Sequence, residues 1–123
     1  MSSAHHSKRI LMQDEFRKQY DTANTRVTLS VILLASRTSG PEEVSEFVDA
    51  TMELAKVCES PCSKHQPLEV LFWLRQKLQR ECRKPCRSAC FRSYCQQHIS
   101  HAGDKTQDMC DRIGNGNIIA LLH

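Results

Sequence analysis

The sequence predicts an all-α protein, a small single-domain bundle of five or six short helices that is stapled by zinc. Two patterns favour helices: apolar residues recur at steps of three and four along much of the 123-residue chain, and prolines and glycines separate these stretches. A third observation favours the metal. Six of the seven cysteines fall between Cys58 and Cys95, and a group of thiols can supply the four ligands of a structural zinc ion.

Composition favours a single globular domain, residues 1–123, with one modest core. Met1–Ser7 is polar and the longest apolar run is only Val31–Ala35, so we expect neither a secretory signal nor a membrane span. The sequence therefore predicts a cytoplasmic or nuclear protein that does not contact membranes. In those compartments thiols stay reduced, which favours metal binding or burial over disulfides.

The first two helices are predicted at Ser7–Tyr20 and Thr25–Ser36. In the first, Met12, Phe16 and Tyr20 follow one another at steps of four, so we expect them to face the core; a stripe that binds a partner is the alternative. The second alternates like a strand at its start, but its length favours a helix. Because it is apolar on all sides, it should be the most buried element of the fold.

The next two helices, Pro41–Cys58 and Pro67–Cys82, have clearer boundaries. A capping box of the form Ser39-Gly-Pro-Glu42 precedes the first, and the turn after it should bring Cys62 back near Cys58. We expect the two helices to pack on each other through apolar side chains, with Leu71, Leu74 and Leu78 against Phe47, Val48 and Leu54.

Pro85 predicts a break after these helices, because it cannot donate the backbone hydrogen bond that a helix needs. A new helix is expected to begin at Cys86 and to run to His98 or Ile99.

A second break is predicted at residues 101–104. The capping box Asp104-Lys-Thr-Gln107 predicts a short last helix through Ile113, with Gly114 as its C-cap. The apolar tail Ile118–Leu122 fits a docked helix, a strand or a self-association segment.

The predicted metal site consists of two Cys-x3-Cys pairs, each at the end of a helix. One or two zinc ions would be coordinated tetrahedrally by cysteine and histidine. The first site comprises Cys58, Cys62, Cys82 and Cys86, and a second could comprise Cys90, Cys95, His98 and Cys110. Cysteines four residues apart on amphipathic helices are as typical of a core as of a metal site, so simple burial is the alternative.

Charge divides the chain into an acidic helical half and a basic, cysteine-rich half. Residues 1–62 contain seven basic and nine acidic residues, and residues 63–123 contain ten and five. Cations on a helix can neutralise phosphates, and aromatic rings beside them can stack on bases. The residues predicted to bind nucleic acid are Trp73, Arg75, Lys77, Arg80, Arg83, Lys84, Arg87 and Arg92.

These features predict a non-enzymatic regulatory protein that binds RNA or DNA through its basic helix surface. An acidic protein partner is almost as well supported; the chain would then be an interaction adaptor, such as an accessory protein that binds a host factor, with structural cysteines. No catalytic residues and no small-molecule substrate are expected, because the sequence contains no glycine-rich phosphate loop, Cys-x-x-Cys or His-Glu-x-x-His motif. Homo-oligomers could form through the stripe of Met12, Phe16 and Tyr20 or through the tail Ile118–Leu122.

Overall fold

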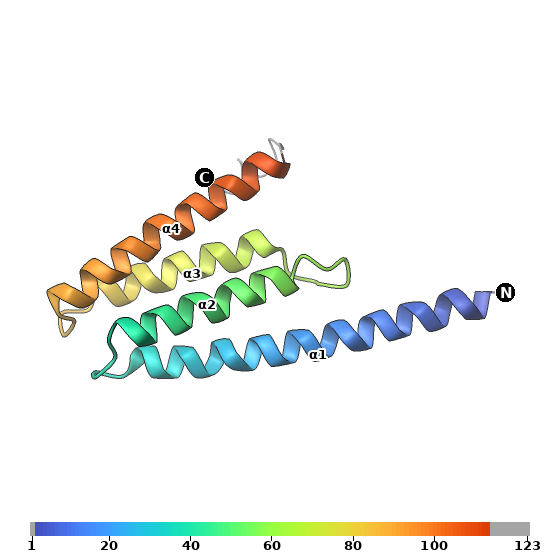
Figure 1. Cartoon of the computed structure of the whole chain (residues 1–123), viewed down its shortest axis with the longest axis horizontal. Coiled ribbons are helices and arrows are strands. Elements are labelled where there is room, and N and C mark those ends of the chain that lie inside the picture. Colours follow the sequence, from blue (N-terminus) through green and yellow to red (C-terminus); the bar gives the residue numbers. More distant parts are fainter. Residues whose placement is uncertain (1, 114–123) are drawn as a thin grey trace.

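The computed structural model describes the backbone of residues 2–113 and the side chains of residues 8–111. Within this part of the chain it contains four α-helices and no strand: α1 (Ser2–Ala35), α2 (Pro41–Val57), α3 (Pro67–Cys82) and α4 (Ala89–Ile113). Figure 1 shows them as a small helical bundle. The predicted all-α class is confirmed, although the described residues form four helices instead of five or six.

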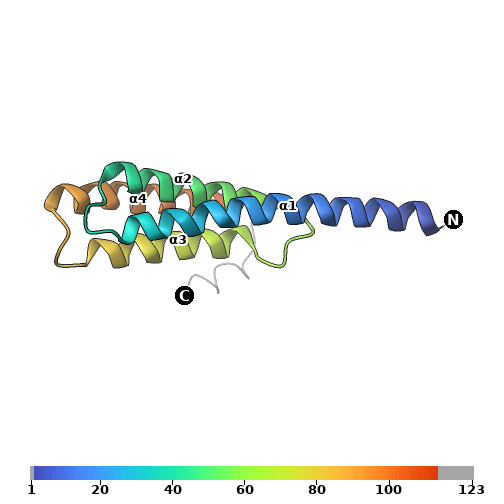
Figure 2. The same ribbon diagram turned by 90° about the horizontal axis from the view of Figure 1, so that it is seen from below.

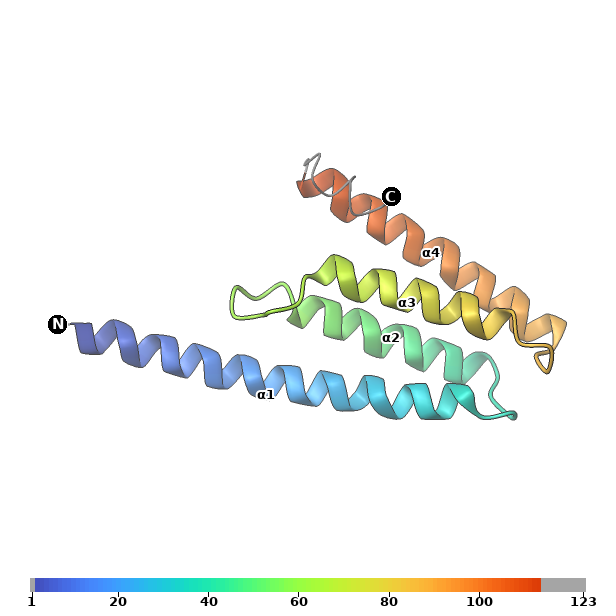
Figure 3. The ribbon, with the colours of Figure 1, turned by 180° about the vertical axis from the view of Figure 1, so that it is seen from behind.

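The four helices are arranged around a central pair. The helices α2 and α3 lie side by side, α1 packs on α2, and α4 packs on α3 (Figures 1 and 3). Consecutive helices run in opposite directions, and the N-terminal part of α1 extends well beyond the bundle (Figure 2). We call residues 2–12 the α1 extension.

The predicted packing of α2 on α3 is confirmed. All six apolar residues expected at this contact are buried, and Leu74 and Leu78 share one core cluster with Phe47, Val48 and Leu54. Burial of side chains of this size stabilises the fold by about 1.5 to 3 kcal/mol each, so this cluster is a main source of stability.

The two helices predicted before residue 36 are one continuous helix, so this part of the prediction is wrong. No proline or glycine lies between Tyr20 and Thr25, and the inward stripe continues through this interval with Ala23 and Val27, which are both buried. Tyr20 is partly buried, as expected, but Met12 is 55% exposed. It lies on the α1 extension, where α2 no longer covers the helix.

The C-terminal half of α1 is not the most buried element of the fold. Val27 and Leu34 are buried, whereas Leu29, Ile32 and Leu33 are each more than half exposed. The reason is that α1 has one main neighbour, α2. A helix that packs on a single neighbour leaves its opposite face in solvent, whatever the hydrophobicity of that face.

The cap at the start of α2 is displaced by one residue from the prediction. Gly40 is the N-cap residue, and its N–H donates to Oε2 of Glu43 at 3.0 Å. The Ser39 hydroxyl instead donates to the carbonyl oxygen of Leu34 at 2.9 Å. The helix is therefore capped by Glu43 and not by the Ser39–Glu42 pair.

The predicted break at Pro85 is confirmed, but α4 begins at Ala89 and not at Cys86. The prediction of a second break at residues 101–104 is wrong, because α4 continues through Gly103. A glycine inside a helix costs about 1 kcal/mol, and burial of Ala102 and Thr106 on either side of it outweighs that cost. Gly114 and the tail Ile118–Leu122 lie outside the described residues.

Candidate nucleic-acid interface and cysteine positions

Glu81 is the centre of the charged residues around the α3–α4 turn. Its side chain is 0% exposed and its two oxygens contact three cations. Oε1 lies 2.8 Å from Nζ of Lys84 and 3.8 Å from Nζ of Lys77, and Oε2 accepts a hydrogen bond of 2.8 Å from Nη2 of Arg87. The negative charge of this buried carboxylate is thus compensated by three cations.

The surroundings of Glu81 keep it ionised. Burial by itself raises the pKa of its carboxyl, but the hydrogen bonds from Lys84 and Arg87, together with their positive charges, outweigh burial and hold the pKa below its usual value.

Arg87 connects this carboxylate to the other side of the bundle. Its Nη1 donates to the carbonyl oxygen of Ser36 (2.9 Å) and to Oγ of Ser39 (2.7 Å), and its Nη2 donates to the carbonyl oxygen of Leu34 (2.6 Å). The guanidinium also lies over the ring of Phe91, 4.4 Å from its centroid. We call these contacts the Glu81–Arg87 network. It joins the end of α1 to the turn between α3 and α4.

Arg87 was predicted to bind nucleic acid, and the structure corrects this assignment. The residue is buried, and its terminal nitrogens are occupied by protein acceptors. One signal in the sequence could have found the network: Glu81 follows Leu78 by three residues and Leu74 by seven, so it lies on the buried stripe of α3.

The other predicted cations remain at the surface to different degrees. Lys77 and Lys84 are partly buried against Glu81. Four further residues are exposed: Arg75, Arg80, Arg83 and Arg92. Arg92 also donates from Nη2 to the carbonyl oxygen of Lys84 at 3.1 Å, which places it beside the turn. We call Arg80, Arg83, Lys84 and Arg92 the basic end of the molecule.

Trp73 lies on α3 at some distance from this end. Its ring packs edge-on against Phe47, with 5.5 Å between the ring centroids, and 40% of the residue is exposed. It also lines an open groove of about 330 Å³ between α1 and α3, together with Tyr20, Val27 and His65 among others. Trp73 is therefore an exposed residue outside the core cluster, and its ring contacts Phe47.

The structure does not bring together the four cysteines of the first predicted metal site. Because α2 and α3 are antiparallel, Cys58 and Cys62 follow α2 at one end of the bundle, and Cys82 and Cys86 lie at the other. The 16 residues of α3 separate these ends by about 24 Å. Two sulfurs bound to one zinc ion are at most about 4.6 Å apart, so the two pairs cannot share an ion in this fold.

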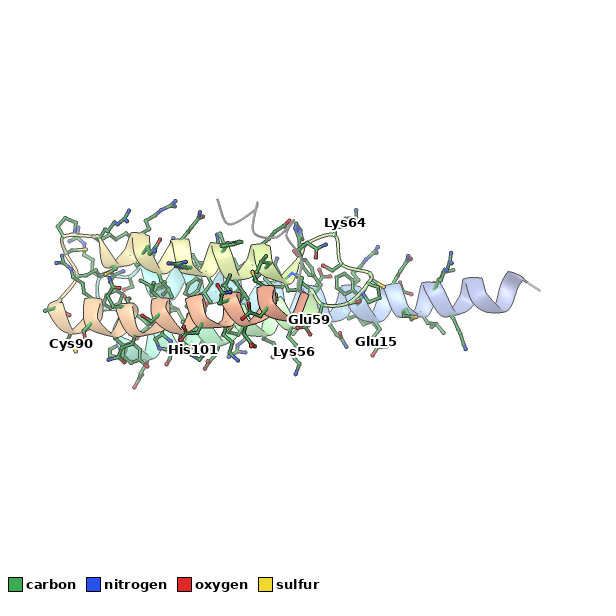
Figure 4. All side chains as sticks on the ribbon, turned by 90° about the horizontal axis from the view of Figure 1, so that it is seen from above. Glu15, Lys56, Glu59, Lys64, Cys90 and His101 are labelled. Atoms are coloured by element: carbon green, nitrogen blue, oxygen red, sulfur yellow. The ribbon has the colours of Figure 1, made fainter. Side chains whose placement is uncertain are left out.

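The second predicted site is not assembled either. Because α4 is continuous, Cys110 lies 12 residues and about 18 Å along the helix from His98. Figure 4 shows Cys90 at the far end of the bundle from Lys64 and Glu59. Among the described residues, no group of three or more Cys, His, Asp or Glu is arranged to hold a metal. Zinc content stays a prediction, which elemental analysis of the purified protein tests directly.

Individual thiols differ strongly in their surroundings. Cys58, Cys95 and Cys110 are buried, whereas Cys86 and Cys90 are exposed. Burial, followed by the nearby Cys82, raises the pKa of the Cys95 thiol to about 11. His98, one turn further along α4, packs edge-on against Tyr94, and burial, followed by the nearby His101, lowers its pKa despite the opposing effect of Asp49.

Comparisons with family models, curated proteins and solved structures find no match to this chain. None of the four helices in the described part of the chain is both long and apolar enough to span a bilayer.

Proposed function

We propose that this protein is a non-enzymatic regulatory protein that binds nucleic acid through its basic end. One observation carries the proposal. Between Arg75 and Arg92 the chain has a single acidic residue, Glu81, and that residue points into the core. The cations around the α3–α4 turn therefore have no acidic neighbour from this segment at the surface.

Two features make this end suited to a polyanion. Its side chains Arg80, Arg83 and Arg92 are exposed, and Arg83 is the C-cap of α3. The Glu81–Arg87 network ties the α3–α4 turn to the end of α1, and Arg92 hydrogen-bonds to the backbone of this turn. Arginine forms bidentate hydrogen bonds with phosphate, and several such contacts supply the sequence-independent part of nucleic-acid affinity.

The non-enzymatic part of the proposal rests on the surroundings of Cys95 and His98. A nucleophilic cysteine reacts as the thiolate, but the pKa of Cys95 is raised to about 11, so this buried thiol is protonated at neutral pH. His98 packs edge-on against Tyr94, and burial is the largest cause of its lowered pKa. These environments are typical of structural residues.

The test is a salt titration of binding, measured by fluorescence anisotropy with labelled single-stranded RNA and duplex DNA. If four cations contact phosphates, the logarithm of the association constant falls against the logarithm of salt concentration with a slope of about −3.6 for duplex DNA and about −2.8 for single-stranded RNA. Between 50 and 200 mM salt these slopes correspond to losses of about 150-fold and about 50-fold. Binding that does not depend on salt, or no binding at low salt, contradicts the proposal.

Charge reversal at two positions tests whether binding depends on the basic end or only on the overall positive charge of the protein. The variant Arg80→Glu/Arg83→Glu should reduce both the affinity and the salt slope, whereas Lys64→Glu/Lys105→Glu, with the same change in charge elsewhere on the surface, should affect both much less. Arg87 is unsuitable for this test because its replacement disturbs the fold. Competition by polyglutamate as strong as that by RNA of equal charge would identify an acidic protein as the better partner.

A further inference from the structure

The α1 extension presents two exposed apolar side chains, Leu11 and Met12. Leu11 is 67% exposed and Met12 is 55% exposed. A helix of about three turns is unstable alone in water, and here it continues beyond the end of α2 (Figure 1). Such a segment gains stability if a second helix covers it.

Basic residues precede Leu11 and Met12 in the chain, and acidic residues follow them. When two copies of this segment run antiparallel, the basic residues of each copy therefore face the acidic residues of the other. The segment reads Lys8-Arg9, four uncharged residues, then Asp14-Glu15. When two copies run antiparallel about a two-fold axis between Leu11 and Met12, Lys8 of each copy lies beside Glu15 of the other. The same alignment places Leu11 of each copy beside Met12 of the other.

The four residues of this pairing share one face of α1. Lys8, Leu11, Met12 and Glu15 lie at i, i+3, i+4 and i+7, which is the spacing of a single helix face, and all four are exposed. Lys8 has no acidic residue three or four positions away in the chain, so it has no ion-pair partner at helical spacing on α1 itself.

We propose that residues 8–15 of α1 form a homodimerisation surface, which pairs antiparallel with the same residues of a second copy of this chain. The contacts are Leu11 with Met12 at the two-fold axis, flanked on each side by a Lys8–Glu15 ion pair. A two-fold interface of this kind uses the same surface on both copies, as is common in homo-oligomers.

The fold leaves room for this arrangement. The α2–α3 loop covers the other side of α1, where Gln13, Phe16 and Arg17 line a hollow with residues 62–65; Figure 4 shows Glu15 and Lys64 on opposite sides. An open groove of about 760 Å³, lined by Lys18 and Lys56 among others, can receive the first turns of the second helix.

The interface is small, so we expect a weak dimer that forms as concentration rises. Specific interfaces usually bury about 800 Å² per partner, and a pair of short helices buries less. Sedimentation equilibrium should show the mass increasing from one chain to two. A molecular mass of one chain at concentrations up to about 1 mM, which corresponds to a binding free energy of only about 4 kcal/mol, overturns the proposal.

Charge exchange tests the antiparallel register. Lys8→Glu alone and Glu15→Lys alone each replace two attractive pairs by two repulsive pairs, and should weaken self-association roughly 10- to 30-fold. The double variant Lys8→Glu/Glu15→Lys should restore it. An equimolar mixture of the two single variants should form a heterodimer, because each of its two pairs is again oppositely charged.

The controls separate this pairing from other modes of association. Lys105→Glu makes the same charge change on α4 and should leave self-association unaltered, and circular dichroism should show equal helicity in all variants. If the mixture associates no better than the single variants, or the double variant stays monomeric while it keeps its helicity, the proposed pairing is wrong.

Discussion

The two ends of the bundle carry similar sequence signals but are stabilised in different ways. Each has a Cys-x3-Cys pair and a proline in the turn that follows a helix: Cys58 to Cys62 after α2, and Cys82 to Cys86 after α3. At the α3–α4 end a buried ion network joins three segments. At the α2–α3 end the corresponding contacts are the ring of His65 stacked on Tyr20, an exposed contact of His65 Nδ1 with Oε2 of Glu69 at 3.9 Å, and a few turn hydrogen bonds.

Cysteine spacing therefore does not determine which contacts hold a turn in place. A buried carboxylate such as Glu81 needs compensating cations, and this requirement fixes the positions of the residues around it. A half-exposed ring pair imposes no comparable requirement. The α3–α4 end should therefore be much more sensitive to mutation than the α2–α3 end.

The largest effect is expected from Arg87→Ala. This variant removes the guanidinium but leaves Glu81 buried, which usually costs about 3 to 5 kcal/mol of unfolding free energy. The neighbouring Arg83→Ala, at an exposed position, should cost less than about 0.5 kcal/mol. Urea denaturation measures both values, and a loss below about 1 kcal/mol for Arg87→Ala would mean that the network contributes little to stability.

The pH dependence of stability should reveal the same network. The pKa of Glu81 is lower in the folded protein than in the unfolded chain, where a glutamate titrates near 4.3. Its ionised form therefore stabilises the fold fully above about pH 4.3, and this contribution is lost as the pH falls towards the lower, folded pKa. The decrease in unfolding free energy on acidification should be shallower in Glu81→Gln; parallel curves for the two proteins would contradict the assignment.

At the α2–α3 end we expect a small effect from His65→Ala. The ring of His65 stacks on Tyr20 with 6.2 Å between centroids, but most of its side chain is exposed. Loss of this contact should reduce the unfolding free energy by about 1 kcal/mol or less, compared with Gln66→Ala as a neighbouring exposed control. A loss as large as that of Arg87→Ala would remove the distinction between the two ends.

Thiol labelling compares the accessibility of the cysteines at the two ends, and we expect it to have almost no effect on stability. Cys86 and Cys90, both exposed, should react with a maleimide in the native protein. The buried Cys58, Cys95 and Cys110 should react only after denaturation. Mass spectrometry of digested samples identifies the labelled sites. Fast native labelling of Cys95 would show that its surroundings are more open than its raised pKa indicates.

Much of the helical architecture could be predicted from periodicity and breakers. Pro41 and Pro67 begin helices, the break at Pro85 is real, and the apolar residues of α2 and α3 that were expected to meet do meet. Local signals failed where burial outweighed them, as at Gly103. They also failed at Met12 and Leu29, because periodicity does not show how far a neighbouring helix extends.

The candidate site was predictable only in part, because the charge of a residue does not reveal whether its side chain points to the core or to solvent. The cations from Arg75 to Arg92 were evident as a basic segment, but Arg87 points inward to Glu81 while Arg80 and Arg83 point to solvent. The cysteine pairs illustrate the same limit at longer range: their spacing was known, but the antiparallel order of α2 and α3 places them about 24 Å apart.

The sequence by itself determined that this chain is helical, where α2 and α3 begin and which half is basic, because these properties depend on neighbouring residues along the chain. Only the tertiary structure decided which charges are buried, which thiols are accessible and that part of α1 lies beyond the bundle. These properties depend on which helices cover one another, and that is set by the packing of residues far apart in the sequence.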